Sequence, residues 1–190
     1  MAGKILAGVI VVFALVTGVA VYWLQEYAYY EPVRFQPGAE IALTPIEGDT
    51  PEVILAENVT GIDANSSPLR FRACFTTPLT HGMLSETYRA YEGAEPLNAP
   101  SWFDCFDAAA IGAALERGEA LAFLGQANIT YGIDRVVAVM PDGRAFAWNQ
   151  MNACGAKVFN GEAPPENCPP APAATPAATP TATPAEVPKE

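Results

Sequence analysis

An uncharged stretch of 20 residues close to the N-terminus constrains this chain more than any other feature. It runs from Ile5 to Leu24 and contains no acidic or basic side chain. An α-helix rises about 1.5 Å per residue, so a helix of this length spans the roughly 30 Å of hydrocarbon in a bilayer. The sequence therefore predicts that residues 1–30 form a transmembrane anchor that contacts the lipid bilayer through residues 5–24.

The residues that flank this stretch indicate how the helix is oriented. Lys4 and the amino terminus precede it, whereas Glu26 and Glu31 follow it. Basic residues favour the cytoplasmic side of a membrane, which places the N-terminus in the cytoplasm. Aromatic side chains gather at the exit of the helix: Tyr22, Trp23, Tyr27, Tyr29 and Tyr30. Such rings settle at the depth of lipid headgroups, so this end marks the far surface of the bilayer.

A cleaved secretory signal is the alternative interpretation of the same stretch. Gly18-Val19-Ala20 supplies the small residues of a cleavage site after an apolar run. The run is longer than the apolar core of about 7 to 15 residues in a typical signal, and its flank is aromatic. These features favour a helix that is retained. Under either interpretation the rest of the chain is exported.

The charge of the chain excludes one class of partner. Acidic side chains number 21 against 10 basic ones, which gives a formal net charge of −11. Such a surface repels the phosphate backbone of nucleic acids within a Debye length, so we expect no nucleic-acid partner. The acidic surface either keeps the domain soluble or attracts a basic partner.

Alternating apolar residues predict a set of short strands between residues 31 and 162. They lie at 33–35, 41–43, 53–55, 69–75, 120–124, 135–140 and 144–148. In the fourth of these, Arg70 and Arg72 share the face opposite Phe71 and Ala73. Pro141-Asp142-Gly143 is a specific turn signal, so the last two strands are expected to form a β-hairpin.

Two helices are predicted within the same region. Leu84, Tyr88 and Tyr91 have the spacing of one helical face, which predicts a helix over 84–91. A second, alanine-rich helix is expected from Asp104 or Asp107 to Arg117, with Gly118 ending it. Helices between short strands and a late antiparallel hairpin indicate an α+β domain over 31–162, and argue against a doubly wound sheet.

The chain changes character at Ala163. The last 28 residues contain nine prolines, eight alanines and four threonines. No apolar core can form from this composition, so residues 163–190 are predicted to be a disordered Pro/Ala/Thr-rich tail. The tail is either an idle solvated segment or a spacer and docking strip.

The four cysteines, Cys74, Cys105, Cys154 and Cys168, all follow the apolar stretch. They are therefore expected in an oxidising compartment, where an even set forms disulfides. Three pairings are possible, of which we favour Cys74 with Cys105 and Cys154 with Cys168; the latter closes a loop worth about 3 kcal/mol. No Cys-x-x-Cys occurs and the chain has one histidine, so redox and metal roles are disfavoured.

Few residues have the pattern of a reactive site, and we expect no catalytic centre and no cofactor. His81 lies in an expected loop without a metal-ligand partner at fixed spacing. Asp104 and Asp107 are candidates for paired carboxylates, although residues three apart at a helix start more naturally cap it. The aromatic residues Trp102, Phe103 and Phe106 form either part of the core, which is favoured, or an exposed patch that binds a partner.

The chain resembles a family with no established activity. The resemblance is carried by YWLQEYAYYEP, by SPLRFRACFTTP and by the run SWFDCFDAAAIGAALERGEALAFLGQANITYGIDRVVAVMPDGRAFAWNQMNACG, and it covers about residues 1–168. The family is an uncharacterised alphaproteobacterial one, catalogued as a domain of unknown function. Its members are sometimes labelled histidine kinase, yet the glycine-rich ATP-binding boxes that such an enzyme requires do not occur in this sequence.

The resemblance implies a location. It indicates a single-pass protein of the bacterial inner membrane whose C-terminal domain is periplasmic. We expect it to act by binding an inner-membrane protein or complex, as an accessory or assembly factor. The alternatives are a periplasmic sensor or regulatory partner of a signalling protein and, less favoured, a hydrolase-type enzyme that uses His81 with Asp104 or Asp107.

Overall fold

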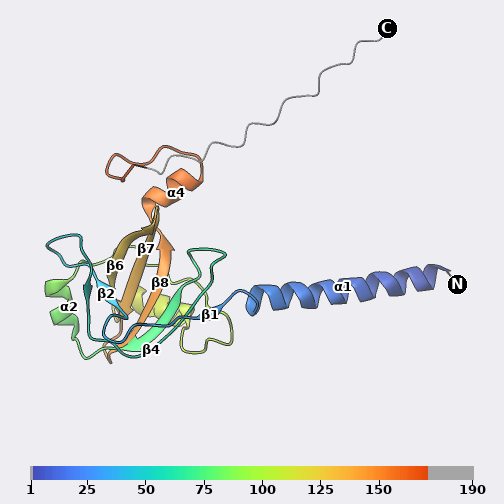
Figure 1. Ribbon diagram of the computed structural model, residues 1–190, viewed down its shortest axis with the longest axis horizontal. Helices are drawn as coiled ribbons and strands as arrows, with labels where there is room; N and C mark the ends of the chain where they lie inside the picture. Colours follow the sequence, from blue (N-terminus) through green and yellow to red (C-terminus); the bar gives the residue numbers. More distant parts are fainter. Residues whose placement is uncertain (1, 171–190) are drawn as a thin grey trace, which may run out of the picture.

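The computed structural model describes residues 2–170, so residues 171–190 of the expected tail lie outside the described part of the chain. The first element is α1 (Ala2–Glu26), which projects away from the remainder of the protein (Figure 1). Residues Gly3–Glu26 are long and apolar enough to cross a membrane, and none of them is buried within the protein. The expected anchor is thus one continuous helix that can span a bilayer.

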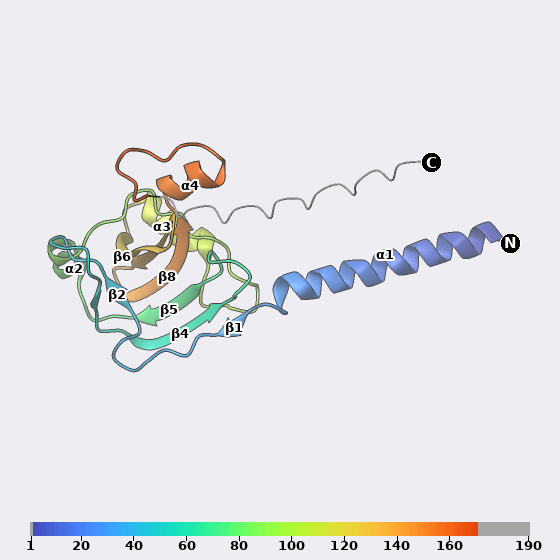
Figure 2. The same cartoon turned by 45° about the horizontal axis from the view of Figure 1, so that its top comes forward.

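The remainder of the described chain is built around a six-stranded antiparallel sheet (Figures 1 and 2). Its strands lie in the order β1 (Glu31–Pro32), β4 (Glu57–Asp63), β5 (Arg72–Thr76), β8 (Arg144–Met151), β7 (Ile133–Val139) and β6 (Leu121–Thr130). A two-stranded ribbon, β2 (Ala42–Leu43) and β3 (Glu52–Val53), and three helices, α2 (His81–Thr87), α3 (Ala108–Glu116) and α4 (Ala153–Phe159), complete the domain. The α+β class is confirmed, with antiparallel pairing between all neighbouring strands.

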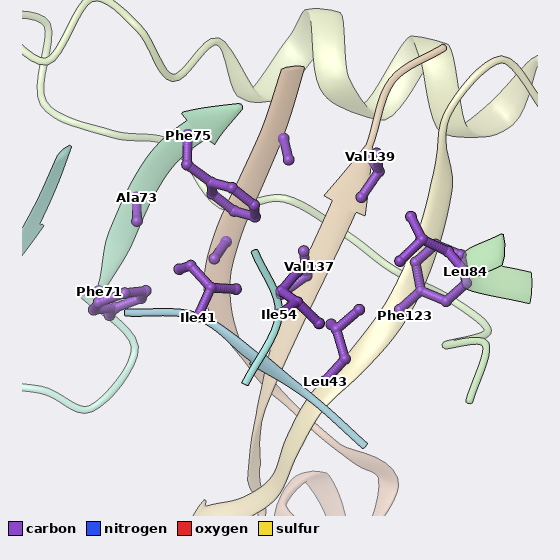
Figure 3. Close-up of a cluster of buried hydrophobic side chains, with 12 residues drawn as sticks. Ile41, Leu43, Ile54, Phe71, Ala73, Phe75, Leu84, Phe123, Val137 and Val139 are labelled. Carbon is purple, nitrogen blue, oxygen red and sulfur yellow. The ribbon is translucent and has the colours of Figure 1, made fainter. Parts of the chain in front are cut away.

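One face of the sheet carries a core of aliphatic and aromatic side chains. Successive residues of a strand point to opposite faces, so Phe75, Val137 and Ala147 come together from three neighbouring strands. Figure 3 shows Leu43 from the ribbon and Leu84 from α2 packing onto this face. Both leucines are fully buried. The ribbon and α2 therefore form the layer that covers this side of the sheet.

The opposite face packs against α3 and the loop that precedes it. Trp148 of β8 is fully buried there, beside Ile111 of α3. Phe106 meets Phe146 and Trp148 edge-on, with ring centroids 5.9 and 6.2 Å apart. Such aromatic pairs add about 0.5 to 1.5 kcal/mol each beyond the burial of their area. The predicted alanine-rich helix is confirmed, and Asp107 caps it by accepting the N–H of Ala110.

The first predicted helix begins and ends earlier than expected. It covers His81–Thr87 and not 84–91, because the Thr80 hydroxyl accepts the N–H of Met83 and starts the helix there. Tyr88 is extended and pairs with Pro45, and Ala90 pairs with Phe123. The helical spacing of Leu84, Tyr88 and Tyr91 was therefore misleading beyond Thr87, since backbone pairing outweighs it.

Several strands also differ from the prediction. Residues 33–35 are not a strand: β1 ends at Pro32, and Val33 adds one further hydrogen bond to the carbonyl of Gly61. β4 was missed because its sequence is polar and interrupted by Asn58, which has a positive φ of 52° at an irregularity in the ladder. The late hairpin is confirmed, although β6 and β8 are longer than expected and α4 was not predicted.

A buried carboxylate joins α4 to the sheet. One oxygen of Asp134 accepts hydrogen bonds from the backbone of Asn128 and the side chain of Asn152, both at 2.8 Å. Asn152 in turn caps α4 at Gly155. The other Asp134 oxygen accepts the Tyr91 hydroxyl at 3.2 Å. Burial, assisted by the charge of Asp134, raises the pKa of Tyr91, so this hydroxyl stays protonated and remains a donor.

Gly155 allows α4 to contact the turn between β6 and β7. Replacing glycine with alanine in α4 and, as a control, in α3 tests this contact. A Cβ at Gly155 would lie 2.8 Å from the Cα of Gly132, so Gly155→Ala should lower stability by about 1 to 3 kcal/mol. At Gly112 in α3 the nearest atom would be 3.7 Å away, and Gly112→Ala should raise stability by up to about 1 kcal/mol. Melting temperatures of the full chain in detergent measure both changes. Equal shifts in one direction would contradict the close contact.

Candidate functional site

A groove of about 830 Å³ opens on the described surface of the domain. It lies between α3, the segment 90–97 and the start of β6. We call it the α3 groove. Most of its lining side chains are small, including Ala109, Gly112 and Ala113 on α3. The exposed carboxylates of Glu95 and Glu116 are also part of the lining.

The periodicity of α3 determines which of its side chains line the groove. Ile111 and Ala114 are buried against the sheet, whereas Ala109 and Glu116 are exposed in the groove. Because glycine and alanine project little beyond the backbone, another polypeptide can approach the axis of α3 closely, as helices do at interfaces rich in small residues. Gly112 itself faces the opposite wall, where a Cβ would meet Pro96 at 3.7 Å.

The opposite wall has little regular structure and is held in place by side chains of the sheet. Gln150 of β8 donates to the carbonyl of Gly93 at 2.8 Å and accepts the N–H of Glu95 at 2.7 Å. Arg72 of β5 donates to the carbonyls of Leu97 and Asn98, at 2.7 and 3.0 Å. These two side chains make the groove a fixed feature of the domain.

Arg72 is a buried cation whose hydrogen bonds all go to backbone carbonyls. It is 3% exposed, and it also donates to Leu69 and Phe71. Its charge is removed from water without a carboxylate in contact. This desolvation lowers the pKa of Arg72 to about 10, an effect that Tyr30 and Asp63 partly oppose. Arg72 thus remains charged at neutral pH and donates to four backbone carbonyls.

The loop beyond the groove contacts the end of α1. The N–H of Ser101 donates to Glu26 Oε1 at 2.5 Å, and the indole N–H of Trp102 donates to the backbone carbonyl of Glu26 at 2.7 Å. Tyr27 stacks on Trp102 with ring centroids 6.4 Å apart. We call these contacts the α1 clamp. The clamp loop and the α3 groove are neighbours, because Ala108 and Ala109 line both the groove and the hollow that includes Ser101.

The three aromatic residues singled out from the sequence have different environments. Phe106 is 5% exposed and belongs to the core, and Phe103 is half-buried against the same cluster. Trp102 is 37% exposed and belongs to the α1 clamp. The expectation of a core position therefore holds for Phe106, while Trp102 lies at the surface.

Both disulfides have the pairing that the sequence favours. Cys74 of β5 is bonded to Cys105, with Cα atoms 6.3 Å apart, and this bond holds the loop of the α1 clamp against the sheet. Cys154 of α4 is bonded to Cys168, with Cα atoms 5.8 Å apart. The second bond fastens the start of the proline-rich segment to α4. The pairs suggest an oxidising compartment.

The residues considered for an enzyme do not form one site. His81 begins α2, and is not in a loop as expected; its Nε2 donates to the carbonyl of Val139 at 2.9 Å. Asp107 caps α3, and Asp104 lies exposed in the turn before it. Asp104 and Asp107 line a different hollow from the one that His81 lines. Within residues 2–170 no hydrogen bond joins His81 to either aspartate, and no group of three potential metal ligands occurs.

The polar residues that build the groove and the clamp were missed by sequence reasoning. Arg72, Gln150 and Ser101 are common residue types at positions without a motif. The one available signal was that Arg72 lies in the middle of the apolar strand predicted over 69–75, where a charged residue requires partners. Two of those partners are backbone carbonyls contributed by a loop about 25 residues later, which a local pattern does not reveal.

Comparison with known proteins gives one match. Residues 41–169 match a family model, DUF6446, described as a family of unknown function. No curated protein matches the chain. No solved structure matches it either.

Proposed function

We propose that this chain, which belongs to DUF6446, a family of unknown function, is a membrane-anchored accessory or assembly protein that binds another membrane protein and catalyses no reaction. One observation carries the proposal. The α3 groove, with a volume of about 830 Å³, lies on the domain beside the loop that is bonded to the end of α1. A groove that adjoins the loop attached to α1 supports binding to another protein of the same membrane.

The lining of the α3 groove supports a polypeptide as the ligand. Its small side chains allow close approach of a helix or an extended segment, and its polar groups are few. Glu95 and Glu116 are exposed in the lining, and the chain as a whole has a net charge of −11. A segment with a small apolar face and basic flanking residues is therefore the complementary partner.

The compartment forms part of the same proposal. Lys4 precedes α1 and the acidic domain follows it, so the positive-inside rule supports a cytoplasmic N-terminus. Two disulfides in the domain support an oxidising environment on the far side. Together these features favour the inner membrane of a bacterium, with the domain in the periplasm.

A photo-crosslinking amino acid placed at two adjacent residues of α3 tests the role of the groove. Ala109 lines the groove, whereas Ala110 is exposed on the same helix and does not line it. With the full chain in its native membrane, we expect benzoylphenylalanine at Ala109 to give a discrete adduct with one partner protein. The same residue at Ala110 is the matched control and should give no such adduct.

A substitution that fills the groove provides the complementary evidence. Ala109→Trp should abolish the adduct formed from a crosslinker at position 113, because the indole occupies the space of the partner. Ala110→Trp should leave that adduct unchanged. The proposal is wrong if both crosslinker positions give the same products, or if Ala109→Trp has no effect on them.

A further inference from the structure

Arg70 carries an unmet hydrogen-bonding requirement at the end of the domain that adjoins α1. Within residues 2–170, its Nη1 is the only buried side-chain nitrogen or oxygen atom without a hydrogen-bond partner. Such atoms are rare in folded proteins, and each one calls for an explanation. Arg72, two residues later, donates to a carbonyl from each of its three guanidinium nitrogens. Arg70 is thus positioned by the fold with donors left over.

Tyrosine rings hold the guanidinium of Arg70 in place. Its Cζ lies 5.3 Å from the ring centroid of Tyr30 and 5.9 Å from that of Tyr29. Tyr30 also meets Trp102 of the α1 clamp edge-on, at 6.2 Å. A guanidinium that packs against aromatic rings loses hydration without losing its charge. It is therefore prepared for an anion that binds its planar set of N–H donors.

The position of Arg70 relative to α1 determines how deep Arg70 lies in a bilayer that α1 spans. The uncharged part of α1 ends at Leu24, and Tyr29 and Tyr30 follow within six residues, after a turn in which Tyr27 and Ala28 bond back to Trp23. The headgroup layer adds about 5 to 7 Å to the hydrocarbon on each side of a bilayer. When α1 spans a membrane, Arg70 consequently lies at the level of the lipid phosphates.

We propose that Arg70, flanked by Tyr29 and Tyr30, binds the phosphodiester group of a phospholipid at the exit of α1. The phosphate oxygens accept N–H donors from the accessible part of the guanidinium, since the Arg70 side chain is only partly buried, in the bidentate arrangement that arginine favours. The acyl chains lie beside Leu24 in the hydrocarbon. Because the chain has a net charge of −11, a zwitterionic headgroup fits better than an anionic one. The site depends on α1 crossing a bilayer and not on the α3 groove.

Native mass spectrometry of the full chain released from mild detergent tests the site. The probes are palmitoyl-oleoyl phosphatidylethanolamine and a digalactosyl diacylglycerol with the same acyl chains but no phosphate. We expect one retained phospholipid and no retained glycolipid. Arg70→Gln should weaken phospholipid retention by about tenfold, the effect of one lost hydrogen-bonded charge. Arg70→Lys should give an intermediate value, because it keeps the charge but loses the planar donors.

Arg89 provides the matched control for the loss of one positive charge. It follows α2, at the end of the domain far from α1 (Figure 1), so Arg89→Gln should retain the phospholipid as the unmodified chain does. Inorganic phosphate added without lipid should not raise the melting temperature of the full chain. The proposal is overturned by equal retention in the Arg70→Gln variant, by equal retention of the glycolipid, or by stabilisation with phosphate alone. None of these outcomes bears on crosslinking at Ala109, so the two proposals fail separately.

Discussion

Replacing Arg72 with methionine should lower the free energy of unfolding by about 3 kcal/mol. Methionine retains much of the length of the side chain but none of its donors, so the carbonyls that Arg72 binds lose their partners. A hydrogen bond to a charged group is worth about 1.5 to 3 kcal/mol, and part of that sum is offset because the buried charge no longer has to be desolvated. The midpoint of urea denaturation of the full chain in detergent measures the change.

Substitution of an exposed arginine shows whether the burial of Arg72 is the cause of the expected loss of stability. Arg144 forms its ion pair with Asp142 at the surface, where both side chains are more than half exposed, so Arg144→Met should change stability by about 0.5 kcal/mol or less. Arg72→Met should also loosen the wall of the α3 groove, because Leu97 and Asn98 lose their attachment to β5. Faster hydrogen exchange in residues 93–98 would report this effect. Equal stability losses in the two variants would contradict the buried role of Arg72.

Removal of the bond between Cys74 and Cys105 by a double alanine substitution should cost about 4 kcal/mol. The two cysteines are 31 residues apart, and opening a loop of that length gives the unfolded chain more conformational entropy. Cys74 is also 8% exposed within the second core, so its sulfur leaves a small void in the double variant. The thermal unfolding midpoint of the full chain, under non-reducing conditions, should fall accordingly.

The second disulfide is the control for this variant. Cys154 and Cys168 are 14 residues apart, and their loop entropy is worth about 3 kcal/mol if the whole protein unfolds as one unit. They join α4 to the end of the described chain, outside both core clusters. Their double alanine variant should therefore release α4 locally and shift the global midpoint by less than half as much. Equal shifts would show that α4 unfolds together with the sheet.

Those elements that depend on local chemistry could be predicted from the sequence. The apolar run identified α1, Asp107 and the alanines identified α3, and Pro141-Asp142-Gly143 identified the late hairpin. The polar strand β4 could not be predicted, because its membership of the sheet comes from pairing with β5 and not from its own pattern. For the same reason the segment after Thr87 was assigned to a helix, although it pairs with β6.

The candidate site was harder to predict than the fold. A groove walled by alanine and glycine leaves no motif, and its depth depends on how a loop is tied to the sheet by Arg72 and Gln150. The aromatic cluster at Trp102 was recognised as a candidate surface, but its attachment to Glu26 joins residues 76 positions apart. Long-range contacts between polar side chains and backbone atoms are invisible to periodicity.

The α1 clamp also affects the thermodynamics of any encounter within the membrane. Two proteins that each cross the bilayer meet by lateral diffusion, and a domain on a loose tether would still have to give up its rotational freedom on binding. Here Ser101 and Trp102 hold the domain to the end of the helix, so much of that entropy is lost before any partner arrives. Association therefore costs less. For the binding role proposed above, the alanine and glycine walls of the α3 groove, which offer little to a freely tumbling protein, can then support a lasting complex.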